Sequence, residues 1–396
     1  MFEIWVGQGL ISSNDKKWQQ HRKILAPAFH FNILHEFLHI INTITPVNLF
    51  YPLSLCAFDI VCDSSMGISM NSQQQKESPY IRAIDELDRL LMQRYLSPML
   101  RVDFLYKFSS VKKRTEQPAK IVEDYTSKVI EERRNYLKNL KVAESFGDVE
   151  ENNNVGLRRK NMAFIDTLLK AQEENGSLMT DNDIRDQVST FIAAGNDTVT
   201  AASCWTLLIL GTYPEIQKKV VDELHQIFGS SRHARTMNDL AELKYLERCI
   251  KETLRLYPTF PFFERQIRED IHFHDGLIAP AGVTASINLF MLHRDPEHFP
   301  DPERFDPDRF LPENCARRHP YSYLPFSAGP RSCIGQKFVL LEGKAVVSTI
   351  LRHFEVEAAQ SIDEVKIEVA LVMKPQNGLK VRLRDRGADD LKLRLN

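Results

Sequence analysis

A single cysteine in a loop that holds two glycines and two prolines is the feature that most constrains this chain. The loop covers residues 325–336, and an apolar helical run over 338–350 follows it at once. The free N–H groups at a helix N-terminus stabilise a thiolate, and so does Arg331, two residues before Cys333. The pattern therefore predicts a thiolate that is presented to a metal.

The neighbours of Cys333 limit which metal it can hold. No other cysteine lies within four residues, which excludes a zinc knuckle and an iron–sulfur cluster at this loop. A lone thiolate suits haem iron: Gly329 and Gly335 would let the backbone approach a flat macrocycle, Phe326 would cover the ring, and Arg331 would reach a propionate. The alternative is a buried, inert cysteine beside a turn, which is the usual role of a single cysteine.

The loop also matches a known signature. Phe326, Gly329, Arg331, Cys333 and Gly335 stand at the spacing Phe-x-x-Gly-x-Arg-x-Cys-x-Gly, which resembles the signature of the cytochromes P450, a family of haem-thiolate monooxygenases. The resemblance implies a mainly α fold with a small β region, one catalytic domain over residues 1–396 around a buried haem b, and Cys333 as the axial iron ligand. It further implies that the family's membrane anchor and first elements are missing from this chain.

Composition supports a large globular protein with reduced cysteines. The 396 residues are 43% hydrophobic, and the six cysteines show no paired spacing, which fits a reducing compartment. The net charge of −2 gives no reason to expect a nucleic-acid partner. Because no stretch of eighteen apolar residues occurs, the sequence predicts no membrane anchor in this chain. The resemblance places a full-length form on the cytosolic face of the endoplasmic reticulum membrane.

Two further sites concern the haem propionates. Trp18 and Arg22 lie four residues apart, which places them on one face of a helix that is expected from Asp15. In the P450 family such a pair donates an indole N–H and a guanidinium to the propionates. Arg265 falls where the family places another propionate arginine.

The pattern His-Glu-x-x-His at His35, Glu36 and His39 is the main rival signal, because it is typical of zinc hydrolases. A zinc site needs both histidines turned toward a third ligand. Here the helical apolar stripe leaves the histidines on the polar face; its members are Ile33, Leu34, Phe37, Leu38 and Ile41. A zinc hydrolase remains an alternative that metal analysis would test.

A long helix is predicted over residues 180–212, opened by a capping box at Thr180 and stopped by Pro214. In its middle, Gly195 weakens the helix and Thr198 can bond back to a carbonyl one turn earlier, which together predict a local groove. The resemblance implies that this groove holds dioxygen and that Asp197 and Thr198 relay protons.

Glu252 and Arg255, at helical spacing i and i+3, would by themselves be a surface pair. The downstream segment 299–307 resembles the family's meander, which implies that Arg304 joins Glu252 and Arg255 in a buried structural triad that locks the cysteine loop. Short strands are expected over 260–268 and 276–290, with closing strands over 365–372 and 379–384.

Residues 22–31 and 306–314 resemble the family 4 branch of the P450s, many of whose members hydroxylate fatty acids at or near the ω carbon. Many of them carry a glutamate that esterifies a haem methyl, whereas this chain has Ala194, so we expect non-covalent haem b. The implied substrate is hydrophobic, a fatty acid or a xenobiotic. A non-catalytic haem-binding product is the second alternative.

Electrons must come from another protein, because the chain holds no flavin or nicotinamide fingerprint. The resemblance implies NADPH–cytochrome P450 reductase, with cytochrome b5 as a second donor. A basic face near the proximal side of the haem would steer an acidic donor; its predicted members are Lys16, Lys17, Lys23, Lys337 and Lys344.

Overall fold

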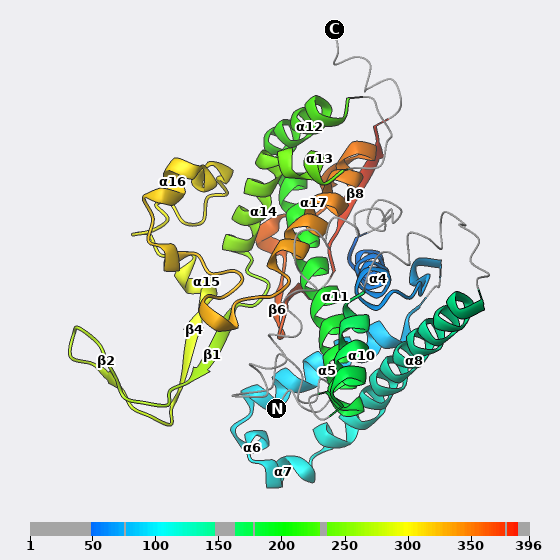
Figure 1. Cartoon of the computed structure of the whole chain (residues 1–396). Helices are drawn as coiled ribbons and strands as arrows, with labels where there is room; N and C mark the ends of the chain where they lie inside the picture. Colours follow the sequence, from blue (N-terminus) through cyan, green and yellow to red (C-terminus); the bar gives the residue numbers. More distant parts are fainter. Residues whose placement is uncertain are drawn as a thin grey trace.

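The structure is a computed structural model that describes residues 49–74, 77–146, 163–176, 179–229, 236–376 and 378–386, with the side chains of 141–146, 369 and 385 left undescribed. In this part of the chain most residues lie in helices, and the strands are short pairs (Figure 1). The predicted mainly α fold with a small β region is confirmed. The helices expected from Asp15 and around residues 33–41 lie outside the described residues.

Helix α11 (Asp181–Thr212) runs through the middle of the molecule (Figure 1). Thr180 caps it by accepting a hydrogen bond from the Asp183 N–H at 3.2 Å, as the capping box predicts. It packs against α4 (Phe50–Val61), α14 (Lys244–Leu256) and α17 (Gln336–His353). Because neighbours cover it on several sides, α11 is buried over most of its length.

Gly195 lets α4 approach α11 closely. A Cβ added at Gly195 would lie 2.7 Å from Cγ2 of Val61, a distance that real side chains do not tolerate. The helix itself continues without interruption from Asp181 to Thr212. The missing side chain is therefore used for helix packing, in addition to any effect on a groove beside Thr198.

A second helical group covers one side of α11. It contains α5 (Pro79–Leu96), α8 (Ser110–Phe146) and α10 (Phe164–Glu174), which bury a core in which the rings of Phe58, Tyr80 and Tyr125 contact one another at tilted angles. Ser78 caps α5, with Pro79 at its first position. Helix α8 begins at Ser110 and continues through Pro118.

The structure describes further helices and helical turns. The α-helices are α6 (Pro98–Arg101), α7 (Asp103–Lys107), α12 (Pro214–Phe228), α13 (Met237–Glu242), α15 (Leu289–Leu292) and α16 (Pro312–Ala316). A π turn covers Cys62–Met66, and 3-10 turns cover Ser72–Gln74, Pro307–Phe310, Pro320–Ser322, Gly329–Arg331 and Ile362–Glu364.

Within the described ranges the strands form four antiparallel pairs. They are β1 (Phe262–Gln266) with β4 (Thr284–Asn288), β2 (Ile271–His272) with β3 (Ile278–Ala279), β5 (Phe354–Ala358) with β8 (Val381–Asp385), and β6 (Ile367–Val369) with β7 (Met373–Pro375). Strands occur in the predicted segments 260–268, 276–290, 365–372 and 379–384, whereas β5, directly after α17, was not predicted. In the β1–β4 register Arg265 stands opposite Ala285.

Among the described residues, no helix combines the length and the apolar character needed to cross a bilayer.

Candidate active site

The loop before α17 folds into a turn that presents Cys333. The Cys333 N–H donates to the carbonyl of Phe326 at 2.9 Å, and the Ser332 N–H donates to the carbonyl of Gly329 at 3.0 Å. Gly329 has φ +75°, a left-handed conformation that favours glycine. Cys333 is exposed, so the loop offers its thiol to a partner rather than burying it.

The cysteine stands at the start of a long helix. Helix α17 begins at Gln336, and its N-cap, Gly335, supplies no side-chain hydrogen bond to the first turn. A Cβ at Gly335 would lie 3.9 Å from the Cys333 sulfur, so the glycine keeps the space beside the thiol open. Helix N-termini stabilise anions, which agrees with a thiolate at this position.

Two apolar anchors fix the loop. Phe326 packs against the core cluster that contains α14 and α17, and Ile334 packs against the cluster that contains the first half of α11. The side chain of Arg265 also reaches the loop, where its Nη2 donates to Ser327 Oγ at 3.1 Å. The structure therefore brings Arg265 into the neighbourhood of the cysteine loop, and Arg331 lies half-buried within the loop.

On α11, the residues predicted to face dioxygen are partly accessible. Ala194, Gly195, Asp197 and Thr198 are half-buried, although the positions around them on the helix are buried. The Thr198 hydroxyl donates to the carbonyl of Ala194 at 2.7 Å, which confirms the predicted bond to the preceding turn.

Asp197 is engaged in an ion pair. Its Oδ2 accepts from Lys374 Nζ at 3.1 Å, and its Oδ1 accepts from Asn196 Nδ2 at 3.3 Å. Burial raises the pKa of the Asp197 carboxyl, and the Lys374 ammonium partly offsets this rise. No sequence pattern singled out Lys374, because it lies far from Asp197 along the chain.

Glu252 and Arg255 form a fully buried ion pair. Arg255 donates through Nε to Oε2 of Glu252 at 2.7 Å and through Nη2 to Oε1 at 2.8 Å, and both side chains are 0% exposed. The backbone N–H of Asp306 also donates to Glu252 Oε1, at 2.9 Å. The pair is therefore a buried one and not a surface pair.

The prediction of Arg304 as the third member is wrong. The Arg304 side chain is exposed, and only its carbonyl takes part, accepting from Arg255 at 3.2 Å. The second cation beside Glu252 is Arg309, whose Nε lies 3.4 Å from Oε1. Both arginines precede a phenylalanine in a similar proline-rich setting, so the sequence alone did not separate them.

His293, which the sequence analysis missed, joins the ion pair to the cysteine loop. Arg255 Nη1 donates to the His293 carbonyl at 2.9 Å, and His293 Nε2 accepts from the Leu324 N–H at 2.9 Å. Burial, with the nearby Arg255 charge, lowers the pKa of His293 to about 3, so its ring is neutral and Nε2 is an acceptor. A fixed path thus runs from Arg255 to the start of the loop.

Other predicted positions are not brought together here. Trp18 and Arg22 lie outside the described residues, as do His35, Glu36 and His39. In the described ranges no group of three or more histidine, cysteine, aspartate or glutamate side chains is placed to hold a metal ion. Lys344 does not belong to an open basic face, because it is buried and donates to Glu247 at 2.9 Å.

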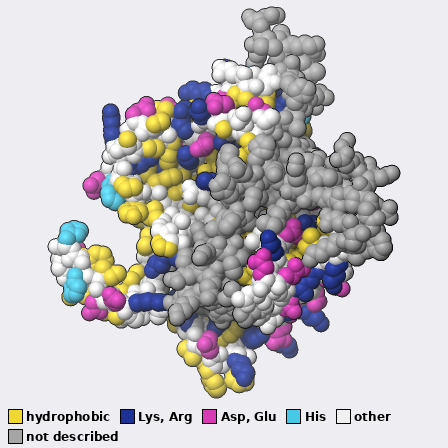
Figure 2. Space-filling model, viewed as in Figure 1, with side chains coloured by type: hydrophobic (Ala, Val, Ile, Leu, Met, Phe, Trp, Pro, Cys, Tyr) yellow, Lys and Arg dark blue, Asp and Glu magenta, His cyan; other side chains and the backbone are white. Residues whose placement is uncertain are grey.

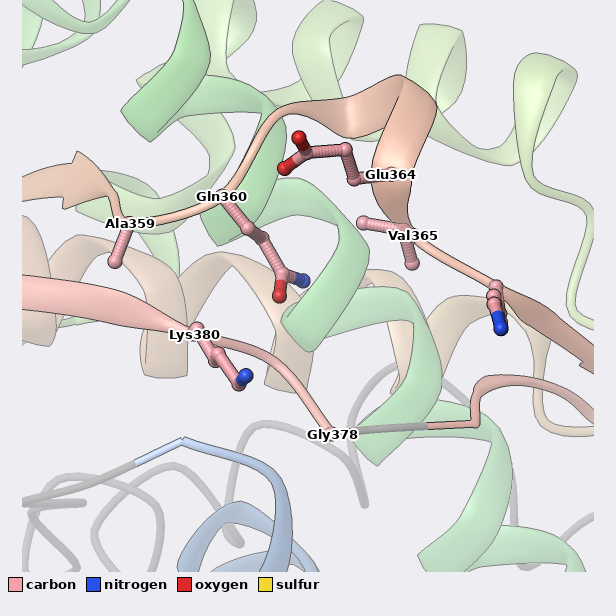
Figure 3. Close-up of a pocket in the computed structure, with 7 residues that line it drawn as sticks. Ala359, Gln360, Glu364, Val365, Gly378 and Lys380 are labelled. Atoms are coloured by element: carbon pink, nitrogen blue, oxygen red, sulfur yellow. The ribbon is translucent and has the colours of Figure 1, made fainter.

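A pocket of about 260 Å³ lies between the ends of β5 and β8 (Figure 3). Polar side chains line it, among them Gln360, Glu364 and Lys380. None of the predicted site residues lines this pocket, so the candidate active site is the region of Cys333 and the middle of α11.

The residues present fit a haem. An exposed thiol at a helix N-terminus would ligate the iron, half-buried small residues on α11 would leave room for a flat ring, and Arg265 would supply a cation beside the loop.

Comparison with known proteins shows the family. The cytochrome P450 family model matches residues 1–382. This chain belongs to the cytochrome P450 family, and it is a monooxygenase whose fold implies a haem cofactor, a redox partner and a hydrophobic substrate.

The relatives narrow the family to one branch. The chain is 41% identical to cytochrome P450 4c3 of Drosophila melanogaster, over 96% of this chain and 74% of that protein. It is 40% identical to cytochrome P450 4V2 of Homo sapiens, over 98% and 76%, and 39% identical to cytochrome P450 4c21 of Blattella germanica, over 95% and 76%. These similarities confirm the resemblance to family 4.

Solved structures share the fold. The crystal structure of the cytochrome P450DA heme domain superposes with a TM-score of 0.78 at 22% identity, covering 98% of this chain and 82% of that one. A crystal structure titled cytochrome P450 (CYP102L1) superposes with a TM-score of 0.80 at 24% identity, covering 97% and 86%. At these identities the likeness supports the fold alone.

Proposed function

We propose that this enzyme hydroxylates C–H bonds of fatty acids or related hydrophobic xenobiotics, with electrons from NADPH delivered by NADPH–cytochrome P450 reductase. The observation that carries the proposal is the exposed Cys333 thiol in a rigid turn at the start of α17. A thiolate-bound haem b supplies the electron push that favours cleavage of the O–O bond.

The residues of this chain have separate roles in holding that group. Cys333 would ligate the iron, Phe326 would cover the ring, and Gly329 and Gly335 would leave room for it. Arg265 and Arg331 would bind propionates, together with Trp18 and Arg22. The buried pair of Glu252 and Arg255, with Arg309 beside it, keeps the loop in place through His293.

Proton delivery is assigned to Asp197 and Thr198. An acid and a hydroxyl at adjacent positions on α11 are a donor and a carrier for the protons that oxygen reduction consumes. Retention of haem is non-covalent, because Ala194 offers no carboxylate to form an ester. Acid–organic extraction is therefore expected to remove all haem from the polypeptide, and Ala194→Glu is expected to leave a fraction attached.

The electron donor binds at the proximal side, where Lys337 is exposed. Lys16, Lys17 and Lys23 are the other members proposed for this face, and cytochrome b5 is proposed as a second donor. Mutation of Lys337 to Glu is expected to raise the apparent KM for the reductase, more at low than at high salt.

A membrane surface is the proposed location, at the cytosolic face of the endoplasmic reticulum. Large apolar side chains are exposed on α6, α7 and their flanks, at the lower end of the molecule (Figure 2). They are Leu96, Met99, Val102, Phe104, Leu105 and Phe108. A cluster of this kind supports contact with an apolar phase.

The test of the proposed function is spectroscopic and catalytic. The reduced carbon monoxide complex is expected to show the red-shifted Soret band of thiolate ligation, and Cys333→Ser is expected to abolish it. Turnover of dodecanoic acid with NADPH and the reductase separates an enzyme from a non-catalytic haem-binding product. A red-shifted band in folded Cys333→Ser protein would contradict the assignment.

A further inference from the structure

Lys374 is a buried cation that three aspartates share. Its Nζ lies 2.8 Å from Asp85 Oδ1, 3.1 Å from Asp197 Oδ2 and 3.7 Å from Asp88 Oδ2. Lys374 comes from β7, Asp85 and Asp88 from α5, and Asp197 from α11. We refer to these four residues as the Lys374 cluster.

The charges of the Lys374 cluster do not balance. Three carboxylates face one ammonium, and isolated negative charge is costly in a buried site. Burial raises the pKa of Asp88 to about 6 and also raises that of Asp197. Although burial opposes it, the three aspartates raise the pKa of Lys374, which therefore stays charged. The buried Tyr80 hydroxyl also faces Asp197, and its raised pKa keeps it protonated. Burial therefore makes the cluster accept a carboxyl proton more readily than exposed aspartates do.

One end of the Lys374 cluster reaches solvent and the other reaches the reaction site. The Asp85 side chain is 34% exposed, whereas Asp88 is 5% and Asp197 is 14% exposed. Asp197 directly precedes Thr198 on α11. Asp85 and Asp197 bind the same nitrogen atom, so their carboxyl groups are close neighbours.

We propose that the Lys374 cluster is a proton port, in which Asp85 holds solvent water against the cluster and Lys374 holds Asp197 in position to pass protons to Thr198. This proposal rests on the proposed function. Hydroxylation consumes one dioxygen, two electrons from the reductase and two protons; one oxygen atom enters the substrate C–H bond and the other leaves as water. In each transfer the O–H bond of the Asp197 carboxyl breaks, and the Thr198 hydroxyl gains that proton while passing its own onward. A proton from bulk solvent, passed along water held at Asp85, then restores the Asp197 carboxyl. Asp197 is thus the donor, and Asp85 and Lys374 are positioning residues.

A purely structural role for these ion pairs makes a different prediction. The segment carrying β6 and β7 is also tied down by other bonds: Leu371 N–H donates to Asp88 at 3.0 Å, and Trp205 Nε1 donates to the Met373 carbonyl at 3.0 Å. Arg89 on α5 pairs with Glu368 on β6 at 3.3 Å, which joins the same elements without contacting Asp197. Arg89→Gln is therefore a matched control for loss of a tether.

The first measurement is infrared and needs no turnover. In the resting, haem-loaded protein, the carbonyl stretch of protonated carboxyl groups is followed by difference spectroscopy between about pH 5 and pH 8. Asp85→Asn removes a negative charge and is expected to move the titration to lower pH, whereas Lys374→Met removes a positive charge and is expected to move it to higher pH. Arg89→Gln is expected to leave the titration in place.

The second measurement is kinetic. With dodecanoic acid, NADPH and the reductase, Asp85→Asn is expected to lower product formed per NADPH by about tenfold, with more peroxide released and a larger solvent isotope effect. If Lys374→Met fails to fold, Asp85→Asn carries the test, because it preserves the shape of the side chain.

Three outcomes separate the possibilities. Opposite infrared shifts for the two variants, with lower coupling in Asp85→Asn, support the proton port. An Asp85→Asn protein that behaves like Arg89→Gln in both measurements overturns it and leaves a structural tether. Absence of the red-shifted carbon monoxide band in the parent protein overturns the proposed function, and that result is independent of the infrared titration.

Discussion

Two buried groups of charges flank the candidate active site, and they differ in balance. Behind the cysteine loop, the Glu252 carboxylate meets Arg255 in a two-point ion pair, with Arg309 close by, and both partners of the pair are fully buried. Beside α11, Lys374 serves three aspartates, and one of these reaches solvent. The fully buried Glu252–Arg255 pair holds the surrounding segments in place, and we call its surroundings the sealed region. The excess of carboxylates in the Lys374 cluster lies near water, where a proton can exchange with solvent.

Breaking the Glu252–Arg255 ion pair is expected to have the largest effect on stability. Glu252→Ala leaves Arg255 as an uncompensated buried cation and is expected to cost about 3–5 kcal/mol of stability. The measurements are the haem-loaded fraction and the denaturant midpoint of the purified protein. Glu247→Ala on the same helix is the control, since Glu247 is partly exposed and its loss is expected to cost much less. Normal haem content in Glu252→Ala would show that the pair does not support the site.

The neutral ring of His293 gives the sealed region a pH dependence. Its pKa of about 3 in the folded state lies below the usual unfolded value, so only the unfolded chain takes up this proton as pH falls from neutral toward 3. This group therefore stabilises the folded state at pH values above the unfolded pKa, and the stabilisation is lost on acidification. Between about pH 7.5 and pH 5.5 the free energy of unfolding falls by about 1.4 kcal/mol from this group.

His293→Gln keeps an acceptor for the Leu324 N–H and is expected to remove this contribution. Unfolding free energies of the two proteins at both pH values measure the difference. His274→Gln, at an exposed position, is expected to leave the slope unchanged. Equal slopes in all three proteins would mean that His293 titrates normally.

On α11, beside the Lys374 cluster, Thr198→Ala is expected to lower product formation without unfolding the protein. The hydroxyl that now donates to Ala194 is removed, so proton transfer slows by about tenfold and electrons are diverted to peroxide. Peroxide yield and product per NADPH are the measurements, with substrate-induced spectral binding as the control for an intact pocket. Unchanged coupling would argue against a role of Thr198 in proton transfer.

A further comparison separates the two candidate arginines beside Glu252. Arg309→Ala removes a cation 3.4 Å from Glu252 and is expected to cost about 1–3 kcal/mol, whereas Arg304→Ala at an exposed site is expected to stay within about 0.5 kcal/mol. Thermal and denaturant unfolding compare them directly. The reverse order would restore Arg304 as the third member.

The sequence by itself determined what depends on local order along the chain. The spacing around Cys333, the capping box at Thr180 and the bond from Thr198 to Ala194 involve residues only a few positions apart, and turn or helix geometry fixes such relations. The alternation of short strands also predicted a small β region. The family resemblance rested on the same local spacing.

Only the tertiary structure decided which distant residues meet. Lys374 reaches Asp197 across 177 positions, His293 reaches Leu324 across 31, and Arg309 rather than Arg304 reaches Glu252. Lys344 was expected on an open face, and the fold buries it against Glu247. Local patterns carry no information on such partners, because burial and charge pairing between segments depend on how the helices pack around α11.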